Sequence, residues 1–178
     1  MKYFSVINIM ISLLLCSLSD AQFGVPKTAE AAVDEFGNVE TENPYAEMAI
    51  RLQSVAPIDI QDAIDIAAII QAAQADPDTR AMIAKLKGDE ASTLEALAKE
   101  VTAMEIVHGL KQSLDELKAI EILFADPERA VVEMEKDGLI DKKKVDFDRK
   151  NPDVLADETR KGVYFGFVSM AVAGGYLE

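Results

Sequence analysis

The sequence predicts an all-α protein, a bundle of five or six helices with a flexible acidic arm at its N-terminal end. Three observations lead to this prediction. Apolar residues recur at helical spacing along most of the chain. Asn or Asp stands directly before Pro at four points, which is a common way for a helix to begin. No stretch shows the sustained alternation of apolar and polar residues that marks a half-buried strand, so we expect essentially no sheet.

The N-terminal segment 1–21 is typical of a cleavable secretory signal peptide. One base, Lys2, precedes an apolar run that is densest over residues 9–16, which is too short to cross a bilayer. Small residues then precede a predicted cleavage site before Gln22. Cys16 would leave with the signal peptide, so the mature chain is expected to be cysteine-free and to form no disulfide.

The predicted signal peptide directs the chain into the secretory pathway, with the cell exterior or an endomembrane lumen as the expected destination. Phe23 lies just past the predicted cleavage site. This junction resembles the signal-plus-transit presequences of algae with secondary plastids, in which a Phe opens the transit part. The resemblance implies a plastid as the alternative destination. Gln22 before the Phe and the acidic residues that follow depart from that pattern.

Residues 22–42 contain Gly and acidic residues without helical periodicity, which predicts the flexible acidic arm. The remaining residues, 43–178, are rich in aliphatic side chains and long enough for a single helical domain with its own core. The formal net charge is −14, and the chain contains no Trp. Nucleic acid is therefore excluded as a partner, because phosphates require Lys and Arg and bases require aromatic stacking.

Capping residues and breakers define six expected helices. Asp or Asn accepts a backbone N–H of the first turn, and Pro in that turn already has a helical φ. The four capping residues are Asn43, Asp76, Asp126 and Asn151. The expected helices cover about 44–54, 59–75, 77–87, 93–124, 127–136 and 152–173.

The fourth helix, 93–124, is the longest of the six. Its predicted start, Ser92 to Glu95, fits a capping box. The apolar seam of this helix shifts phase near His108 and Gly109. Since an interior Gly costs about 1 kcal/mol relative to Ala, we expect a kink or break there.

His108 is the only histidine of the chain. The spacing of Glu105 and His108 is that of di-iron helical bundles, which need a second such pair. That pair cannot form with one histidine, so we expect no metal there. His108 follows Val101 and Met104 at helical spacing, which favours a histidine that packs against a neighbouring helix.

Residues 133–144 imitate a calcium-binding loop, with alternating acids and then Gly138. Lys144 stands where such a loop needs a bidentate Glu. We therefore interpret Gly138 as the residue that ends the preceding helix.

The stretch 163–177 contains no charged residue. A helix that is apolar all round is buried in a core or in a membrane, and fifteen residues are too few for a span. We therefore expect a central core helix and no integral membrane span in the mature chain. Docking on a partner or on a membrane surface is the alternative for this stretch.

Residues 64–78 and 114–128 align with one another at an offset of fifty residues. A duplicated helix–turn–helix unit would explain the similarity. The small set of residue types that begin and end most helices also explains the similarity, and we favour this second explanation.

No catalytic residues, metal cluster or phosphate-binding loop can be identified, so the protein is expected to be no enzyme and to hold no cofactor. The expected function is that of a non-enzymatic helical binding or structural protein, specifically an extrinsic subunit of a membrane-associated complex. A carrier of a small apolar ligand, lipid or pigment, is the alternative, and a carboxylate-based enzyme is the third. Residues 22–140 carry a net charge of −14, whereas residues 141–161 contain seven bases and six acids, and we expect a protein partner or membrane complex to dock on this second segment. The candidate docking residues are Lys142, Lys143, Lys144, Arg149, Lys150, Arg160 and Lys161.

Overall fold

The computed structural model describes residues 44–88, 96, 99–140 and 144–178. Within these ranges the chain is all-α, as predicted, with no strand and with seven helices whose bounds are described; residues 96 and 99–100 are also helical. One helix more than expected is present, because the short α8 carries no apolar periodicity that reveals it. The helices are α2 (Ala46–Val55), α3 (Ile60–Ala75), α4 (Pro77–Gly88), α6 (Ala103–Leu123), α7 (Pro127–Lys136), α8 (Val145–Lys150) and α9 (Pro152–Ala173). The predicted signal peptide 1–21 and arm 22–42 lie outside the described residues.

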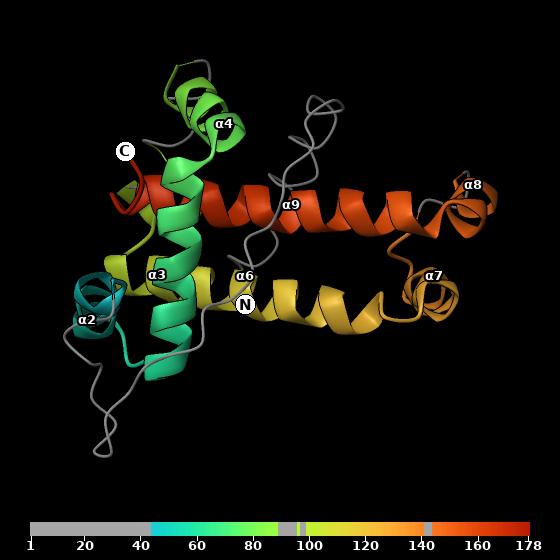
Figure 1. Cartoon of the computed structure of the whole chain (residues 1–178), viewed down its shortest axis with the longest axis horizontal. Coiled ribbons are helices and arrows are strands. Elements are labelled where there is room, and N and C mark those ends of the chain that lie inside the picture. Colours follow the sequence, from blue (N-terminus) through green and yellow to red (C-terminus); the bar gives the residue numbers. More distant parts are fainter. Residues whose placement is uncertain (1–43, 89–95, 97–98, 141–143) are drawn as a thin grey trace.

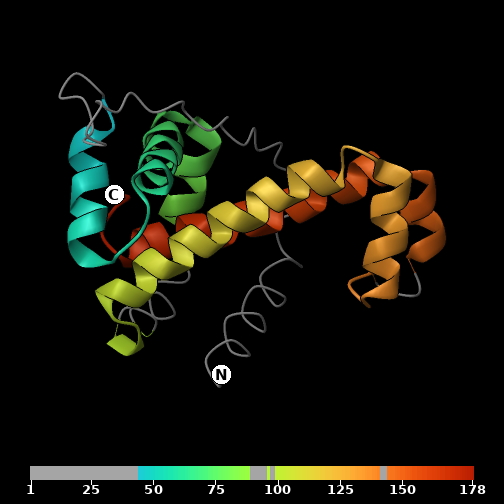
Figure 2. The same cartoon turned by 90° about the horizontal axis from the view of Figure 1, so that it is seen from below.

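The two longest helices, α6 and α9, lie side by side and run in opposite directions (Figure 1). Helices α2, α3 and α4 pack around one end of this pair, and α7 and α8 pack at the other end (Figure 2). The described part of the chain is therefore an elongated two-helix spine with helices at both ends, rather than the simple bundle that we expected.

Two of the predicted Asp–Pro helix starts form as expected. The Asp76 carboxylate accepts hydrogen bonds from the Thr79 backbone N–H at 2.7 Å and from the Thr79 hydroxyl at 2.6 Å. The Asp126 carboxylate accepts a hydrogen bond from the Arg129 backbone N–H at 3.3 Å. Both sites therefore satisfy a backbone donor that the first helical turn leaves without a partner. This shared cap accounts for the Asp–Pro part of the internal similarity.

The other two predicted starts differ from expectation. Asn151 precedes α9, but its side chain donates to the Phe147 carbonyl at 2.8 Å and thereby closes the last turn of α8. The expected cap Asn43 lies outside the described residues, and α2 begins only at Ala46, two residues past Pro44.

Helix α6 begins ten residues later than expected. The Thr102 hydroxyl accepts from the Glu105 backbone N–H at 3.2 Å, and the Glu105 carboxylate accepts from the Thr102 N–H at 2.8 Å. These reciprocal bonds form a capping box. The predicted box at 92–95 lies outside the described residues.

The predicted break near His108 and Gly109 is wrong, because α6 is continuous from Ala103 to Leu123. Gly109 serves close packing instead. A Cβ at this position would overlap the terminal methyl group of Met170 on α9. The side-chain-free backbone therefore lets α6 and α9 approach one another.

The interpretation of His108 as a packing residue is also wrong, because His108 and Met104 are exposed. The phase shift detected in the sequence marks the true start of the buried face. That face consists of Ile106, Val107, Leu110, Leu114, Leu117 and Ile120.

Buried apolar side chains form two separate clusters. The larger cluster, which we call the main core, joins α2, α3, α4, the first part of α6 and the second part of α9. Its C-terminal contributors confirm the core interpretation of residues 163–177, and they are Tyr164, Phe165, Phe167, Val168, Met170, Ala171, Tyr176 and Leu177. The smaller cluster, which we call the distal core, contains Val131, Met134, Ile140 and Leu155.

The chain ends in a tight turn that returns to the main core. The Tyr176 backbone N–H donates to the Ala171 carbonyl at 2.8 Å, and Gly175 between them has a φ of 68°. Gly adopts this left-handed conformation without strain. The turn places the Tyr176 ring 4.8 Å from the Arg51 guanidinium carbon, which ties the C-terminus to α2.

Candidate functional site

The bases predicted to form a docking segment lie in two places. Lys144 directly precedes α8, and Arg149 and Lys150 are its last two residues. Arg160 and Lys161 lie more than two turns into α9. The two remaining candidates, Lys142 and Lys143, lie outside the described residues.

Most of the described bases have an acidic partner within the chain. The Lys144 ammonium lies 3.9 Å from a Glu158 carboxylate oxygen, and an Arg149 guanidinium nitrogen lies 2.5 Å from Glu135. Lys150 is exposed and forms no ion pair with the part of the chain that the structure describes.

The two bases within α9 are also paired. Arg160 binds Glu121 of α6 at 2.9 Å, and Lys161 binds Asp157 one turn earlier at 2.7 Å. Each internal pair offsets the positive charge that an anionic partner would recognise. The sequence showed the excess of bases, but it did not show that acids from α6, α7 and α9 neutralise them.

Exposed apolar side chains are concentrated at the end of the molecule where α7 and α8 lie. We call residues 127–140 and 144–155 the distal unit. Seven large apolar side chains are exposed among the described residues, and four of them belong to the distal unit, with a fifth in the last turn of α6. These five are Ile122, Val132, Leu139, Phe147 and Val154. The other two, Ile50 and Met104, belong to α2 and to the beginning of α6.

The end of α7 explains how Leu139 comes to face solvent. The Leu139 backbone N–H donates to the Met134 carbonyl at 2.9 Å, and the Gly138 N–H donates to the Glu135 carbonyl at 3.1 Å. Gly138 has a φ of 72°, which completes a Schellman turn. The interpretation of Gly138 as a helix-ending residue is confirmed. The turn leaves Leu139 69% exposed and buries Ile140 in the distal core.

Phe147 is the exposed aromatic residue of α8. It lies between Asp146, which is exposed, and Asp148, which is buried. Its side chain is 55% exposed. An aromatic residue isolated among charged neighbours was the sequence signal for this position, and analysis of the basic residues alone missed it.

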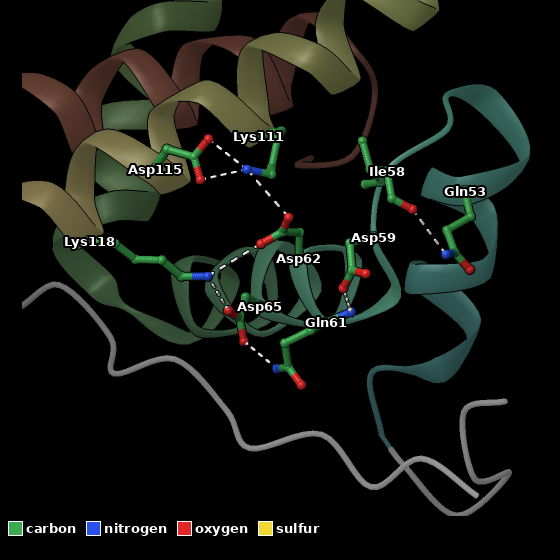
Figure 3. A network of polar contacts seen from close by, with 9 residues as sticks. All are labelled: Gln53, Ile58, Asp59, Gln61, Asp62, Asp65, Lys111, Asp115 and Lys118. Carbon is green, nitrogen blue, oxygen red and sulfur yellow. Dashed lines mark hydrogen bonds and ion pairs between the residues drawn. The ribbon is translucent and has the colours of Figure 1, made fainter. Parts of the chain in front are cut away.

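A charged network joins α3 to α6 (Figure 3). The Lys118 ammonium lies 2.7 Å from one Asp65 oxygen and 3.3 Å from Asp62. The Lys111 ammonium bridges Asp62 at 3.3 Å and Asp115 at 2.5 Å. Every charged group of this network therefore already has a partner of opposite charge.

Both ammonium groups of this network are held in their charged form. The hydrogen bond to Asp115 is the main cause of the raised Lys111 pKa, with a smaller contribution from Asp62. Desolvation would lower the Lys118 pKa, but the hydrogen bonds and charges of Asp65 and Asp62 outweigh it and raise the pKa. A lysine that acts as a catalytic base needs a lowered pKa, and these two are raised. The network therefore serves to join α3 to α6.

A second buried polar group links α4 to α9. The Tyr164 hydroxyl lies 3.2 Å from the Thr79 hydroxyl, which in turn donates to Asp76. Burial raises the pKa of Tyr164, so the phenol is protonated at neutral pH. On α9, the Ser169 hydroxyl donates to the Phe165 carbonyl at 2.9 Å. Both arrangements support the fold rather than present a reactive group.

Residues 44–88, 96, 99–140 and 144–178 contain no group of three or more His, Cys, Asp or Glu residues that is arranged to hold a metal ion. None of the helices in these ranges has the length and apolar character needed to cross a membrane. Comparison with known proteins gives no match to a protein-family model, to a curated protein or to a solved structure.

Proposed function

We propose that this protein is a non-enzymatic helical binding protein, an extrinsic subunit that docks on a membrane-associated complex through its distal unit. The observation that carries the proposal is the gathering of exposed Val132, Leu139, Phe147 and Val154 at the end that lies away from the main core. Single exposed apolar residues are ordinary, but their concentration at one end of an acidic protein is typical of a contact surface.

The ion pairs of the docking segment change how it is expected to bind. Because Arg149 and Lys144 already contact acids, apolar side chains supply most of the contact and Lys150 contributes orientation. Lys142 and Lys143 remain part of the proposed docking segment. The proposed partner is therefore a protein surface with an apolar centre, rather than a strongly anionic surface.

The route to this partner remains the one inferred from the N-terminal segment. Residues 1–21 support entry into the secretory pathway, and the junction at Phe23 keeps the plastid as the alternative compartment. Among the described residues, the buried polar groups serve helix caps and helix pairing. No observation there favours the apolar-ligand carrier or the carboxylate enzyme.

Affinity purification of the tagged protein from its source tests the proposal. The double variant Leu139→Ser, Phe147→Ser removes apolar surface from the distal unit. Ile50→Ser is the matched control, because Ile50 is 59% exposed on α2, among the helices at the other end of the spine. We expect the double variant to lose a membrane-complex partner by about tenfold or more, since anchor side chains carry most of the binding energy. The Ile50 variant is expected to retain that partner.

Circular dichroism of both variants checks that the helical fold is intact, since both remove exposed side chains only. Equal recovery of the same partners with all three proteins would contradict the proposal. An alkaline wash of membranes from the source gives a second measurement. An extrinsic subunit is released into the wash, whereas retention through it would contradict an extrinsic attachment. Because apolar side chains supply most of the proposed contact, high salt alone is expected to release little of the protein.

A further inference from the structure

The two buried clusters are unequal and separated along the spine. The main core contains twenty-five buried residues, whereas the distal core contains four. On α9, the distal core ends at Leu155 and the main core begins with Val163 and Tyr164. This interval of eight residues corresponds to roughly 12 Å of helix. Between these two points, α9 buries no large apolar side chain.

Few side-chain contacts bridge the interval on α6. Ile120 is buried there but belongs to neither cluster. The ion pair between Arg160 and Glu121 joins α6 and α9 at 2.9 Å, and the Glu121 side chain is 64% exposed. Exposed ion pairs contribute little to stability. The mechanical link between the two clusters is therefore mainly the two continuous helices themselves.

Local features also make the distal unit weak. Helix α8 has six residues and no side-chain hydrogen bond at its N-cap, and α9 likewise begins without a side-chain cap. Of the four residues of the distal core, only Val131 is almost fully buried, and Met134, Ile140 and Leu155 each retain 7 to 8% exposure. Short helices without caps need tertiary packing to form, and here that packing is small.

We infer that the distal unit is a separate unfolding unit, which opens and closes while the main core remains folded. Proteins open in contiguous cooperative segments whose free energies follow their local burial. The small distal core sets the free energy of the local opening, and the main core sets that of global unfolding. The inference does not depend on the proposed docking function, because it follows from the distribution of buried side chains.

Native-state hydrogen exchange on the full chain, read by mass spectrometry or NMR in low concentrations of urea, tests the inference. We expect the protection factors of the α7 amides to be about tenfold or more lower than those of the amides of α3 and of α6 between Ile106 and Leu117. The exchange of the α7 amides should depend only weakly on urea, because a local opening exposes little surface.

A matched pair of variants distinguishes the two levels of opening. Met134→Ala removes a buried Met from the distal core, and Met82→Ala removes one of nearly equal burial, 7% against 5%, from the main core. We expect Met134→Ala to accelerate exchange in α7. Met82→Ala should accelerate exchange in α3 and α6 but leave α7 unchanged, since the contacts of Met82 are the same before and after a distal opening.

A single cooperative unit gives a different pattern. In that case the α7, α3 and α6 amides share one opening free energy, and each variant accelerates all of them equally. Either observation overturns the inference. If Met82→Ala does not fold, the protection and urea dependence of the unsubstituted protein decide the question alone.

Discussion

The Asp65 carboxylate on α3 lies 2.7 Å from the Lys118 ammonium on α6, and the Asp65 side chain is only 4% exposed (Figure 3). The second Asp65 oxygen accepts a hydrogen bond from the Gln61 side chain at 2.9 Å. A buried carboxylate is costly unless it is both paired and hydrogen-bonded. Lys118 and Gln61 together therefore offset the cost of burying the Asp65 carboxylate.

Replacement of Lys118 by Met is expected to lower the free energy of unfolding by about 2 kcal/mol, because the buried Asp65 carboxylate then loses a charged hydrogen-bond partner that is itself 40% exposed. Lys111→Met is the matched control. Its closest partner, Asp115, is 55% exposed, so its loss should cost less than about 1 kcal/mol. Urea denaturation of the two variants measures the difference. Equal losses would show that the burial of Asp65 has no particular cost.

Alkaline pH is expected to destabilise the fold partly through Tyr164. Its pKa is raised in the folded chain, chiefly by burial, so folding favours the protonated phenol. The corresponding stability is present below the unfolded pKa of about 10 and is lost as pH rises through the higher folded value. The raised pKa values of Lys111 and Lys118 act in the same direction.

Thermal denaturation between about pH 8.5 and 11 tests the role of Tyr164. We expect Tm to fall across this range, and to fall less steeply in Tyr164→Phe, which cannot ionise. At neutral pH this variant should lose about 1 kcal/mol with the hydroxyl contact to Thr79. Parallel slopes in the two proteins would contradict the assignment.

Two glycines at the α6–α9 interface are expected to respond differently to a methyl group. A Cβ at Gly174 would lie 2.8 Å from Ile106 Cγ2 and 2.7 Å from the Tyr176 ring. Gly174→Ala should therefore destabilise the protein by about 1 to 3 kcal/mol through overpacking. At Gly109 the obstacle is only the flexible end of Met170.

Gly109→Ala should remain within about 1 kcal/mol of the unsubstituted protein, because the gain in helix propensity offsets the displacement of the Met170 methyl group. Thermal denaturation of both variants compares these costs directly. A larger loss for Gly109→Ala than for Gly174→Ala would contradict the packing argument.

Deletion of residues 163–178 is expected to give unfolded or insoluble protein. The deletion removes Tyr164 and Phe167, both nearly fully buried, from the centre of the main core. Loss of one large core side chain typically costs about 3 to 5 kcal/mol, and this deletion removes several. Circular dichroism and gel filtration of the truncated chain measure the outcome. A soluble, fully helical product would show that this segment is dispensable to the core.

The helix starts at Asp76 and Asp126 and the helix end at Gly138 could be predicted from the sequence alone. Caps act within four residues, so the chemistry that fixes these boundaries is contained in the local sequence. The uncharged stretch 163–177 was equally informative, because an apolar segment of that length in an acidic chain is stable only when it is buried.

Only the tertiary structure decided which side of α6 is buried, and hence that His108 is exposed and that Gly109 is a contact point rather than a break. Periodicity gives the spacing of an apolar face but not the helix that covers it. The same limit applied to the docking segment. Its bases are adjacent in sequence, but their charge is offset by Glu135, Glu121 and Glu158. Ion pairs between separate helices depend on how those helices pack, and no local pattern encodes that arrangement.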